Sequence, residues 1–253
     1  MLKARVIPTI LWKDFGIVKG VGFNSWRRVG TLLPAIKVYN TRQVDELIIV
    51  DITATEQNRE PDYEVIDEIA DECFVPLTVG GGVKSVDHIK KLLRAGADKV
   101  AINSGCYSDP DIISRGADLF GTQCMVVSID VFKHPDGRYE CYSSSGKMAT
   151  GKHPVEWAMA MEAKGAGELL ITSITNDGAM NGYDIELIKN VTHGVSIPVI
   201  ASGGAKDYED MYRAITVAGA SAVAAASIFH FTEQTPLEAK NFLRQKGILV
   251  RKN

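Results

Sequence analysis

Short runs of aliphatic and β-branched residues alternate with amphipathic stretches along the whole chain. The run VVSID at residues 126–130 is typical, because mostly apolar residues lead into one acidic side chain and the pattern then stops. Such a run predicts a buried strand whose last residue points its carboxylate out of the core. Runs of this kind predict strands near residues 5–11, 46–52, 76–80, 98–103, 124–130, 167–173, 197–202 and 221–227.

Amphipathic segments with helix-like boundaries fill the intervals between these strands. Four prolines stand where a first helical turn would begin, a place at which proline breaks no hydrogen bond: Pro61, Pro110, Pro154 and Pro236. The predicted helices lie near residues 31–44, 61–73, 84–95, 109–120, 153–165, 184–193, 207–218 and 235–246. Alternating strands and helices over 253 residues predict an α/β fold, the (βα)8 TIM barrel.

Segments of the first half of the chain recur in the second half. The sequence LIIVDIT at 47–53 resembles LLITSIT at 169–175, and GADKVAIN at 96–103 resembles GASAVAAA at 219–226. Because separate segments repeat at nearly the same offset, a chance similarity is hard to sustain. We therefore expect one domain over residues 1–253, built from two duplicated half-barrels of about 1–120 and 121–253.

Composition narrows the classes of partner. A formal net charge of -3 gives no basic excess that would favour nucleic acid or an anionic membrane. No apolar run approaches the ~18 residues that a membrane span needs. The four cysteines form no CxxC pair, so we expect reduced thiols and a cytoplasmic setting. We predict neither a metal site nor a cofactor.

Two matched sets of small residues follow the predicted strands. Residues 80–82 (GGG) and 103–105 (NSG) end two strands of the first half, and 203–204 (GG) and 226–227 (AS) end two of the second, joined by 177–178 (DG). Glycines let backbone N–H groups approach an anion closely, and small hydroxyl residues add donors. These glycines could instead form only tight turns, but matched sets in both halves favour two phosphate sites. A ligand with a phosphate at each end would span the barrel mouth.

Asp130 is the acidic strand end between the two predicted phosphate sites. Proton transfer during a reaction usually requires an acid and a base on opposite sides of the substrate. The similarity of the two halves places the partner of Asp130 at Leu11, whose side chain carries no proton. Asp14 lies beyond the expected strand end, so one half of a two-carboxylate site is predicted to be missing.

Charged residues begin four of the predicted strands, at the opposite end of the barrel. Their alternating signs would let them form a self-neutralising ring, since an isolated buried charge is very costly. Alternatively, they are solvated strand starts, as lysine and glutamate usually are. The ring would make a polar constriction that admits something small through the barrel base. The four residues are Arg5, Glu46, Lys99 and Glu168.

These motifs together resemble the cyclase subunit of imidazole glycerol phosphate synthase over essentially the whole chain. The similarity is carried by DITA at 51–54, TVGGG at 78–82, GADKV at 96–100, DG at 177–178 and ASGG at 201–204. The resemblance implies a substrate with two phosphates, the phosphoribulosyl-formimino aminoimidazole carboxamide ribotide of histidine biosynthesis. It also implies a glutaminase subunit docked at the N-terminal barrel face, whose ammonia travels through the barrel to the mouth.

The resemblance assigns a role to each matching position. Asp130 matches one catalytic aspartate, Asp98 matches a contact to the glutaminase, and Lys19 belongs to a basic first loop that binds substrate. The first phosphate site would use Gly82, Asn103 and Ser104, and the second Asp177, Gly178, Gly204, Ala226 and Ser227. The ammonia gate would consist of Arg5, Glu46, Lys99 and Glu168, which favours the functional interpretation of these charges.

The second catalytic aspartate of the family falls on Leu11. Loss of one acid–base group typically costs about 10²–10⁴-fold in rate. The leading hypothesis is therefore a paralogue that receives ammonia but has impaired cyclase activity. It would supply a sugar amidotransferase that converts an acetamido to an acetamidino group on a surface polysaccharide. The alternative is a working histidine-pathway cyclase in which Asp14 or Asp51 substitutes.

Two further interpretations remain open. A non-catalytic scaffold would only dock and activate the glutaminase, although a basic loop able to close on a ligand argues against this. The isomerase that precedes the cyclase in histidine synthesis shares the fold and both phosphate sites. It also uses paired aspartates, so Leu11 counts against it equally, and the four strand-start charges favour the cyclase family.

Overall fold

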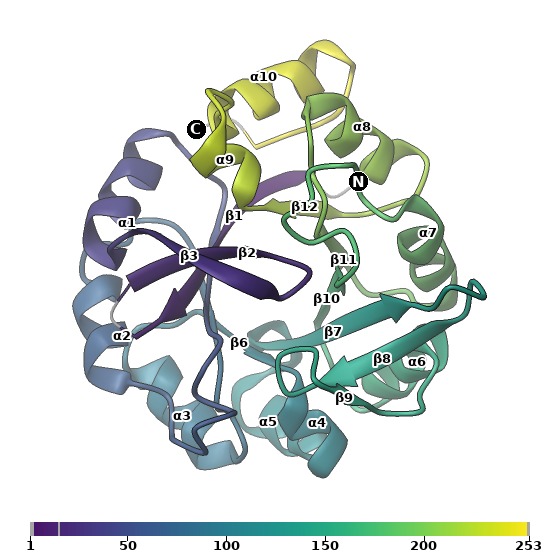
Figure 1. The fold of residues 1–253 in the computed structure, drawn as a ribbon. Coiled ribbons are helices and arrows are strands. Elements are labelled where there is room, and N and C mark those ends of the chain that lie inside the picture. Colours follow the sequence, from purple (N-terminus) through teal and green to yellow (C-terminus); the bar gives the residue numbers. More distant parts are fainter. Residues whose placement is uncertain (1–2, 15, 252–253) are drawn as a thin grey trace.

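Eight parallel strands close into a barrel in this computed structural model, which describes residues 3–14 and 16–251 (Figure 1). Neighbouring strands follow the order β1-β4-β5-β6-β7-β10-β11-β12, and β12 pairs with β1 to close the ring. The predicted (βα)8 TIM barrel is confirmed. The barrel strands are β1 (Arg5–Lys13), β4 (Leu47–Asp51), β5 (Leu77–Gly80), β6 (Lys99–Ile102), β7 (Met125–Lys133), β10 (Glu168–Ser173), β11 (Val199–Ser202) and β12 (Ala222–Ala225).

Helices surround the strands and cover the outer face of the barrel (Figure 1). Each predicted helix is present, usually shorter by one to three residues at either end, as expected where helix ends fray. None of the described helices has the length and apolar content that a membrane crossing requires. They are α1 (Leu32–Thr41), α2 (Tyr63–Ala70), α3 (Val86–Arg94), α5 (Ile112–Phe120), α6 (Pro154–Ala163), α7 (Ile185–Gly194), α8 (Tyr208–Thr216) and α10 (Pro236–Gln245).

The four prolines expected in first helical turns divide into two pairs. Pro154 and Pro236 are the first residues of α6 and α10, as predicted. Pro61 and Pro110 instead lie one residue before the N-caps of α2 and α5, so the prediction was wrong for them. In α2 the reason is local: the Asp62 side chain caps the helix by accepting a hydrogen bond from a backbone N–H of the first turn.

Two hairpins and two short helices at the carboxyl ends of the strands were not predicted. Each hairpin continues the first strand of one half of the barrel, and each short helix follows the last strand of one half. The sequence NSWRRVG of β3 is polar and mostly exposed, so it lacks the alternation that signals a strand. These elements are β2 (Gly16–Val21), β3 (Asn24–Gly30), β8 (Tyr139–Ser143), β9 (Met148–Ala149), α4 (Ser104–Ser108) and α9 (Ser227–Phe231), with a 3-10 turn, η1 (Thr122–Cys124), before β7.

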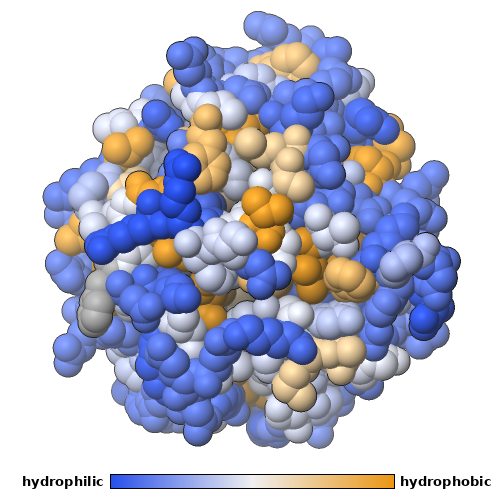
Figure 2. Space-filling model, in the orientation of Figure 1, coloured by the Kyte–Doolittle hydropathy of each residue, from blue (hydrophilic) through white to orange (hydrophobic). Residues whose placement is uncertain are grey.

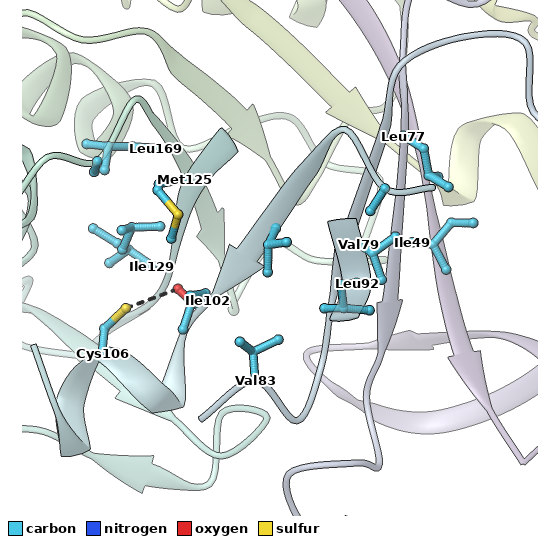
Figure 3. Packing of buried hydrophobic residues seen from close by; sticks show 14 of the residues in the cluster. Ile49, Leu77, Val79, Val83, Leu92, Ile102, Cys106, Met125, Ile129 and Leu169 are labelled. Carbon is cyan, nitrogen blue, oxygen red and sulfur yellow. Dashed lines mark hydrogen bonds between the residues drawn. The ribbon is translucent and has the colours of Figure 1, made fainter. Parts of the chain in front are cut away.

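The core has two layers because successive strand residues point to opposite faces of the sheet. On β4, Ile49 packs outward against the helices, whereas Ile48 packs inward toward the barrel axis. Figure 3 shows the outer layer, in which residues of β4, β5, β6, β7 and β10 meet Leu92 of α3 and Cys106 of α4. The inner layer is smaller and consists of Ile7, Ile48, Ala101, Val126, Leu170, Ile200, Ala222 and Ala224.

Candidate active site

A cavity of about 380 Å³ opens at the carboxyl ends of the barrel strands. The β2–β3 and β8–β9 hairpins lie in front of the barrel in Figure 1, and Figure 2 shows hydrophilic side chains dominating the rim of this face. Barrel enzymes carry out their chemistry at this end. The predicted catalytic Asp130 and its counterpart Leu11 both line this cavity. All the predicted substrate-binding positions line it as well: Lys19, Gly82, Asn103, Ser104, Asp177, Gly178, Gly204, Ala226 and Ser227.

The two predicted phosphate loops adopt matching backbone conformations. Gly81 and Gly204 both have left-handed φ angles, of 108° and 107°. A Cβ on Gly81 would lie 2.2 Å from the carbonyl oxygen of Asp51, and one on Gly204 would lie 2.2 Å from that of Gly182. Both turns therefore require glycine for steric reasons, and both also line the cavity. The tight-turn interpretation and the phosphate-loop interpretation are compatible.

Asp130 lies inside the cavity at only 9% exposure. Its Oδ2 accepts a hydrogen bond of 2.6 Å from Nδ2 of Asn103, which follows β6 and precedes α4. Burial raises the pKa of Asp130 to about 7, and the charge of Asp177 adds to the rise, whereas the Asn103 hydrogen bond opposes it. A carboxyl group with this pKa can both hold and release a proton near neutral pH, which suits acid–base chemistry.

Leu11 occupies on β1 the place that Asp130 occupies on β7. Leu11 pairs with Val50 of the next barrel strand, β4, and Asp130 pairs with Thr172 of its own next strand, β10. Leu11 lines the same cavity as Asp130. The equivalent position in the first half of the barrel therefore carries an apolar side chain and no carboxylate.

The two carboxylates considered as substitutes are poorly placed for proton transfer. Asp14 is exposed in the turn that follows β1 and does not line the cavity. Asp51 lines it, but its Oδ1 accepts hydrogen bonds from Thr53 N at 3.0 Å, Thr53 Oγ1 at 2.9 Å and Ala54 N at 3.1 Å. Its Oδ2 also lies 2.6 Å from Nη2 of Arg59. Asp51 thus organises the loop after β4, and the geometry supports neither residue as the second acid.

Lys19 is enclosed in the cavity wall, at 3% exposure, which the sequence did not indicate. It lies on β2, and its Nζ donates a hydrogen bond of 3.0 Å to the carbonyl oxygen of Thr9. Burial lowers the pKa of Lys19 to about 8, and the charge of Asp177 opposes this shift. Burial likewise raises the pKa of Asp177 to about 6, against the charge of Lys19.

Sequence reasoning also missed two serines in the turn between β8 and β9. Ser144 and Ser145 line the cavity with left-handed φ angles of 52° and 56°. Ser144 N donates to Ser104 Oγ at 2.9 Å, and Ser145 Oγ donates to the carbonyl oxygen of Ile52 at 2.9 Å. The run SSSG at 143–146 was the available signal, since serine and glycine favour turns, but nothing in it showed that the turn reaches the cavity.

The four strand-start charges form a closed ring across the barrel base. Arg5 Nη1 lies 2.9 Å from Glu46 Oε1, and Arg5 Nη2 contacts Glu168. Lys99 Nζ lies 3.0 Å from both Glu46 Oε2 and Glu168 Oε2. Burial alone would raise the pKa of Glu46, but the charges of Arg5 and Lys99 outweigh it and hold that pKa below its usual value. These residues therefore pair with one another instead of standing as separate solvated strand starts.

Asp98 lies beside this ring in the chain, immediately before β6. The residue is exposed, and its Oδ2 accepts a hydrogen bond of 2.8 Å from Leu77 N. Its side chain is thus both tied to the start of β5 and open to solvent on the base side. Among all the described residues, no group of three or more His, Cys, Asp or Glu side chains is arranged to hold a metal ion.

Known proteins are similar to this chain over nearly its full length. Residues 5–235 match the family model described as histidine biosynthesis protein. The chain is 47% identical to the imidazole glycerol phosphate synthase subunit HisF of Dehalococcoides mccartyi, over 99% of both chains. It is 45% identical to the protein of the same name from Dictyoglomus thermophilum, again over 99% of both chains. The chain therefore belongs to the histidine biosynthesis protein family, as a HisF-like member of the cyclase type.

Proposed function

We propose that this chain is the ammonia-accepting barrel subunit of a glutamine amidotransferase complex, with weak cyclase activity of its own. One observation carries the proposal: a salt-bridge ring closes the barrel base beneath a cavity in which Leu11 stands where a second carboxylate is expected. In this proposal the charged ring at the barrel base passes a small molecule. The barrel mouth carries one carboxylate for acid–base chemistry, Asp130, and Leu11 in place of its partner.

The ring acts as the ammonia gate in this proposal. Each cation contacts two carboxylates, so opening one contact leaves the others in place and avoids an isolated buried charge. Above the ring the barrel axis is filled by apolar side chains, among them the small residues Ala101, Ala222 and Ala224. A small neutral molecule fits such a path better than an ion, whose desolvation would be costly.

A glutaminase subunit docked at the base would supply the ammonia. The relatives are named as subunits, which supports a partner protein for this chain as well. The exposed carboxylate of Asp98, next to Lys99 of the ring, is the residue that we assign to the contact.

The apolar side chain of Leu11 in the cavity motivates a different acceptor for the ammonia. We assign it to a sugar amidotransferase that forms an acetamidino group from an acetamido group on a surface polysaccharide. A second candidate is the histidine-pathway cyclase itself, acting on the bisphosphate ribotide. The identity of 45–47% over 99% of the chain to proteins named as that synthase subunit favours this second candidate.

Co-purification with any glutaminase subunit that is encoded near this gene tests the proposal. We expect a stable complex, glutamine-dependent modification of the acetamido sugar when the amidotransferase is added, and slow turnover of the bisphosphate ribotide. Lys99→Met should reduce transfer from glutamine but not from added ammonium salt, with the exposed Lys246→Met as matched control. Lack of complex formation would refute the proposal, and rapid turnover of the ribotide would favour the histidine-pathway candidate.

A further inference from the structure

Two hydroxyl side chains, Thr9 and Ser128, occupy equivalent places in the two halves of the barrel. Each lies two residues before a member of the equivalent pair Leu11 and Asp130, on the same strand. We propose that Thr9 and Ser128 form a holding site for ammonia just below the barrel mouth. The inference rests on the proposed ammonia-accepting function and adds a binding site to it.

Both hydroxyl residues face the barrel axis. Ile7 of β1 and Val126 of β7 belong to the apolar layer around this axis. Thr9 and Ser128 follow them by two residues, and residues two apart on a strand share one face of the sheet. Both residues line the cavity. Because β7 lies four strands from β1 in the ring of eight, the two hydroxyl groups approach the axis from opposite sides.

The hydroxyl group of Thr9 is buried without a partner. Thr9 has an exposure of 8%, and its Oγ1 has no hydrogen-bond partner among the described residues. Nζ of Lys19 donates to the backbone carbonyl oxygen of Thr9 and leaves Oγ1 unpaired. A buried unpaired hydroxyl group costs stability, and valine would fill the same space without that cost. This orphaned group in the cavity wall therefore points to a small polar ligand.

An unpaired acceptor lies beside Ser128. Val127 pairs with Ile102, so the next residues in the same register are Ser128 and Asn103. Nδ2 of Asn103 donates to Asp130, whereas its Oδ1 is buried and has no partner among the described residues. Asn103 lines the cavity as well.

These groups match the hydrogen-bonding capacity of ammonia, which has one lone pair and three N–H groups. The Thr9 hydroxyl group can donate to the lone pair, and Ser128 Oγ and Asn103 Oδ1 can each accept an N–H. The apolar layer below, which contains Ile7 and Val126, favours a neutral molecule because an ion would lose its hydration there. A molecule held at this level lies directly beneath a ligand bound at the mouth.

Water is the competing occupant, since it also donates and accepts hydrogen bonds. The two occupants differ in their response to ammonium salt, because a site that holds only water does not saturate with it. An ammonium ion attracted to Asp130 would be a further explanation of any response. Potassium, a cation of similar size, controls for this effect of charge.

The first test is a titration of the full chain, without a glutaminase, carrying ¹³C in its threonine methyl groups. Loss of one signal in Thr9→Val assigns the methyl group of Thr9. This signal should shift saturably with ammonium chloride at pH 8.5, but not with potassium chloride at the same ionic strength. Thr216 is the internal control and should not shift, since it is exposed and its hydroxyl group donates to the carbonyl oxygen of Tyr212. Ser128→Ala should raise the apparent Kd for ammonia by about 5-fold, the effect of one lost hydrogen bond.

The second test measures turnover of the bisphosphate ribotide at varied ammonium concentration. Thr9→Val should raise the KM for ammonium salt by about 5-fold, while kcat and the KM for the ribotide stay within about 2-fold of the native values. Thr9→Ser keeps the hydroxyl group and should retain the native KM. Thr216→Val is the matched control for removal of a threonine hydroxyl group. Circular dichroism establishes that each variant is folded.

Three results would overturn the inference: no saturable shift of the Thr9 signal beyond that with potassium chloride, an unchanged Kd in Ser128→Ala, or an unchanged KM for ammonium in Thr9→Val. The titration requires neither a glutaminase nor an acceptor. Failure to bind a glutaminase would therefore refute the proposed function while the Thr9 signal still saturated. The holding site and the proposed function fail by different results.

Discussion

Leu11 and Asp130 are equivalent residues of the two halves of this barrel, and each stands at the point where a barrel strand continues into a hairpin. Leu11 pairs with Val18 of β2, and Asp130 pairs with Tyr142 of β8. The backbone therefore offers two matching places for a proton-carrying side chain, and the sequence fills only one of them. The first half of the barrel therefore lacks, at this position, the proton-carrying group that the second half has.

Leu11→Asp should raise turnover of the bisphosphate ribotide with ammonium salt, by about 10-fold or more, because it restores an acid–base group at the equivalent position. Leu11→Asn is the matched control, because asparagine is polar and nearly the same size as aspartate but exchanges no proton. Steady-state rates of the native chain, Leu11→Asp and Leu11→Asn at pH 7 measure this gain. Equal gains for Asp and Asn would mean that polarity rather than proton transfer limits the native chain.

Asp130→Asn should stabilise the fold in a pH-dependent way. The pKa of about 7 in the folded chain lies above the ordinary value of aspartate, so the folded state binds this proton more tightly than the unfolded state. The stability contributed by the proton is present in full below about pH 4 and is lost as pH rises through 7.

Urea unfolding at pH 4 and pH 8 measures this effect. The variant should exceed the native chain in unfolding free energy by roughly 1–4 kcal/mol at pH 8, a gain that is absent at pH 4. A gain of the same size at both pH values would show that titration of Asp130 is not its source.

Lys240→Met should destabilise the fold by about 3–5 kcal/mol, because it leaves a buried carboxylate without its cation. Lys240 Nζ lies 2.8 Å from Asp45 Oδ1, and Asp45 Oδ2 accepts a hydrogen bond from Val6 N, which ties α10 to the barrel base. Lys246→Met, in an exposed pair with Glu209, is the control and should change stability by less than about 1 kcal/mol. Similar small losses for both variants in chemical denaturation would rule this account out.

Gly178→Ala should weaken ligand binding through the hairpin that carries Lys19. A Cβ at this position would lie 1.9 Å from the carbonyl oxygen of Gly20, so β2 must move away from the cavity. Gly137→Ala is the matched control, because its φ of 87° imposes a similar backbone strain while no atom lies within 4 Å of the added Cβ. Calorimetric titration with the bisphosphate ribotide should show a higher Kd only for Gly178→Ala; equal affinities would contradict the role of the hairpin.

The barrel itself could be predicted from the sequence because its strands are buried on both faces and read as continuous apolar runs. The repeat between the halves also aligned Leu11 with Asp130, and the strand pairing agrees: Leu11 with Val50, Asp130 with Thr172. These features could be predicted because a strand's apolar run and the repeated segments are both visible in short stretches of sequence.

The burial of Lys19 could not be predicted in this way. Its environment depends on the β2–β3 hairpin folding back over the mouth and on Asp177 from the other half of the chain. Lysine side chains are mostly exposed, so Lys19 beside Gly20 normally indicates an exposed loop. The same holds for Ser144 and Ser145, which reach the cavity only through the turn between β8 and β9.

The most direct test of this account is the kcat of the purified chain on the bisphosphate ribotide with saturating ammonium salt, measured beside the Dehalococcoides mccartyi relative. Ammonium salt removes any dependence on a glutaminase, so the rate reports the barrel mouth alone. With Leu11 in place of a carboxylate, we expect a kcat lower than the relative's by about 10²-fold or more. A kcat within a few-fold of the relative's would contradict the account and identify this chain as a working cyclase.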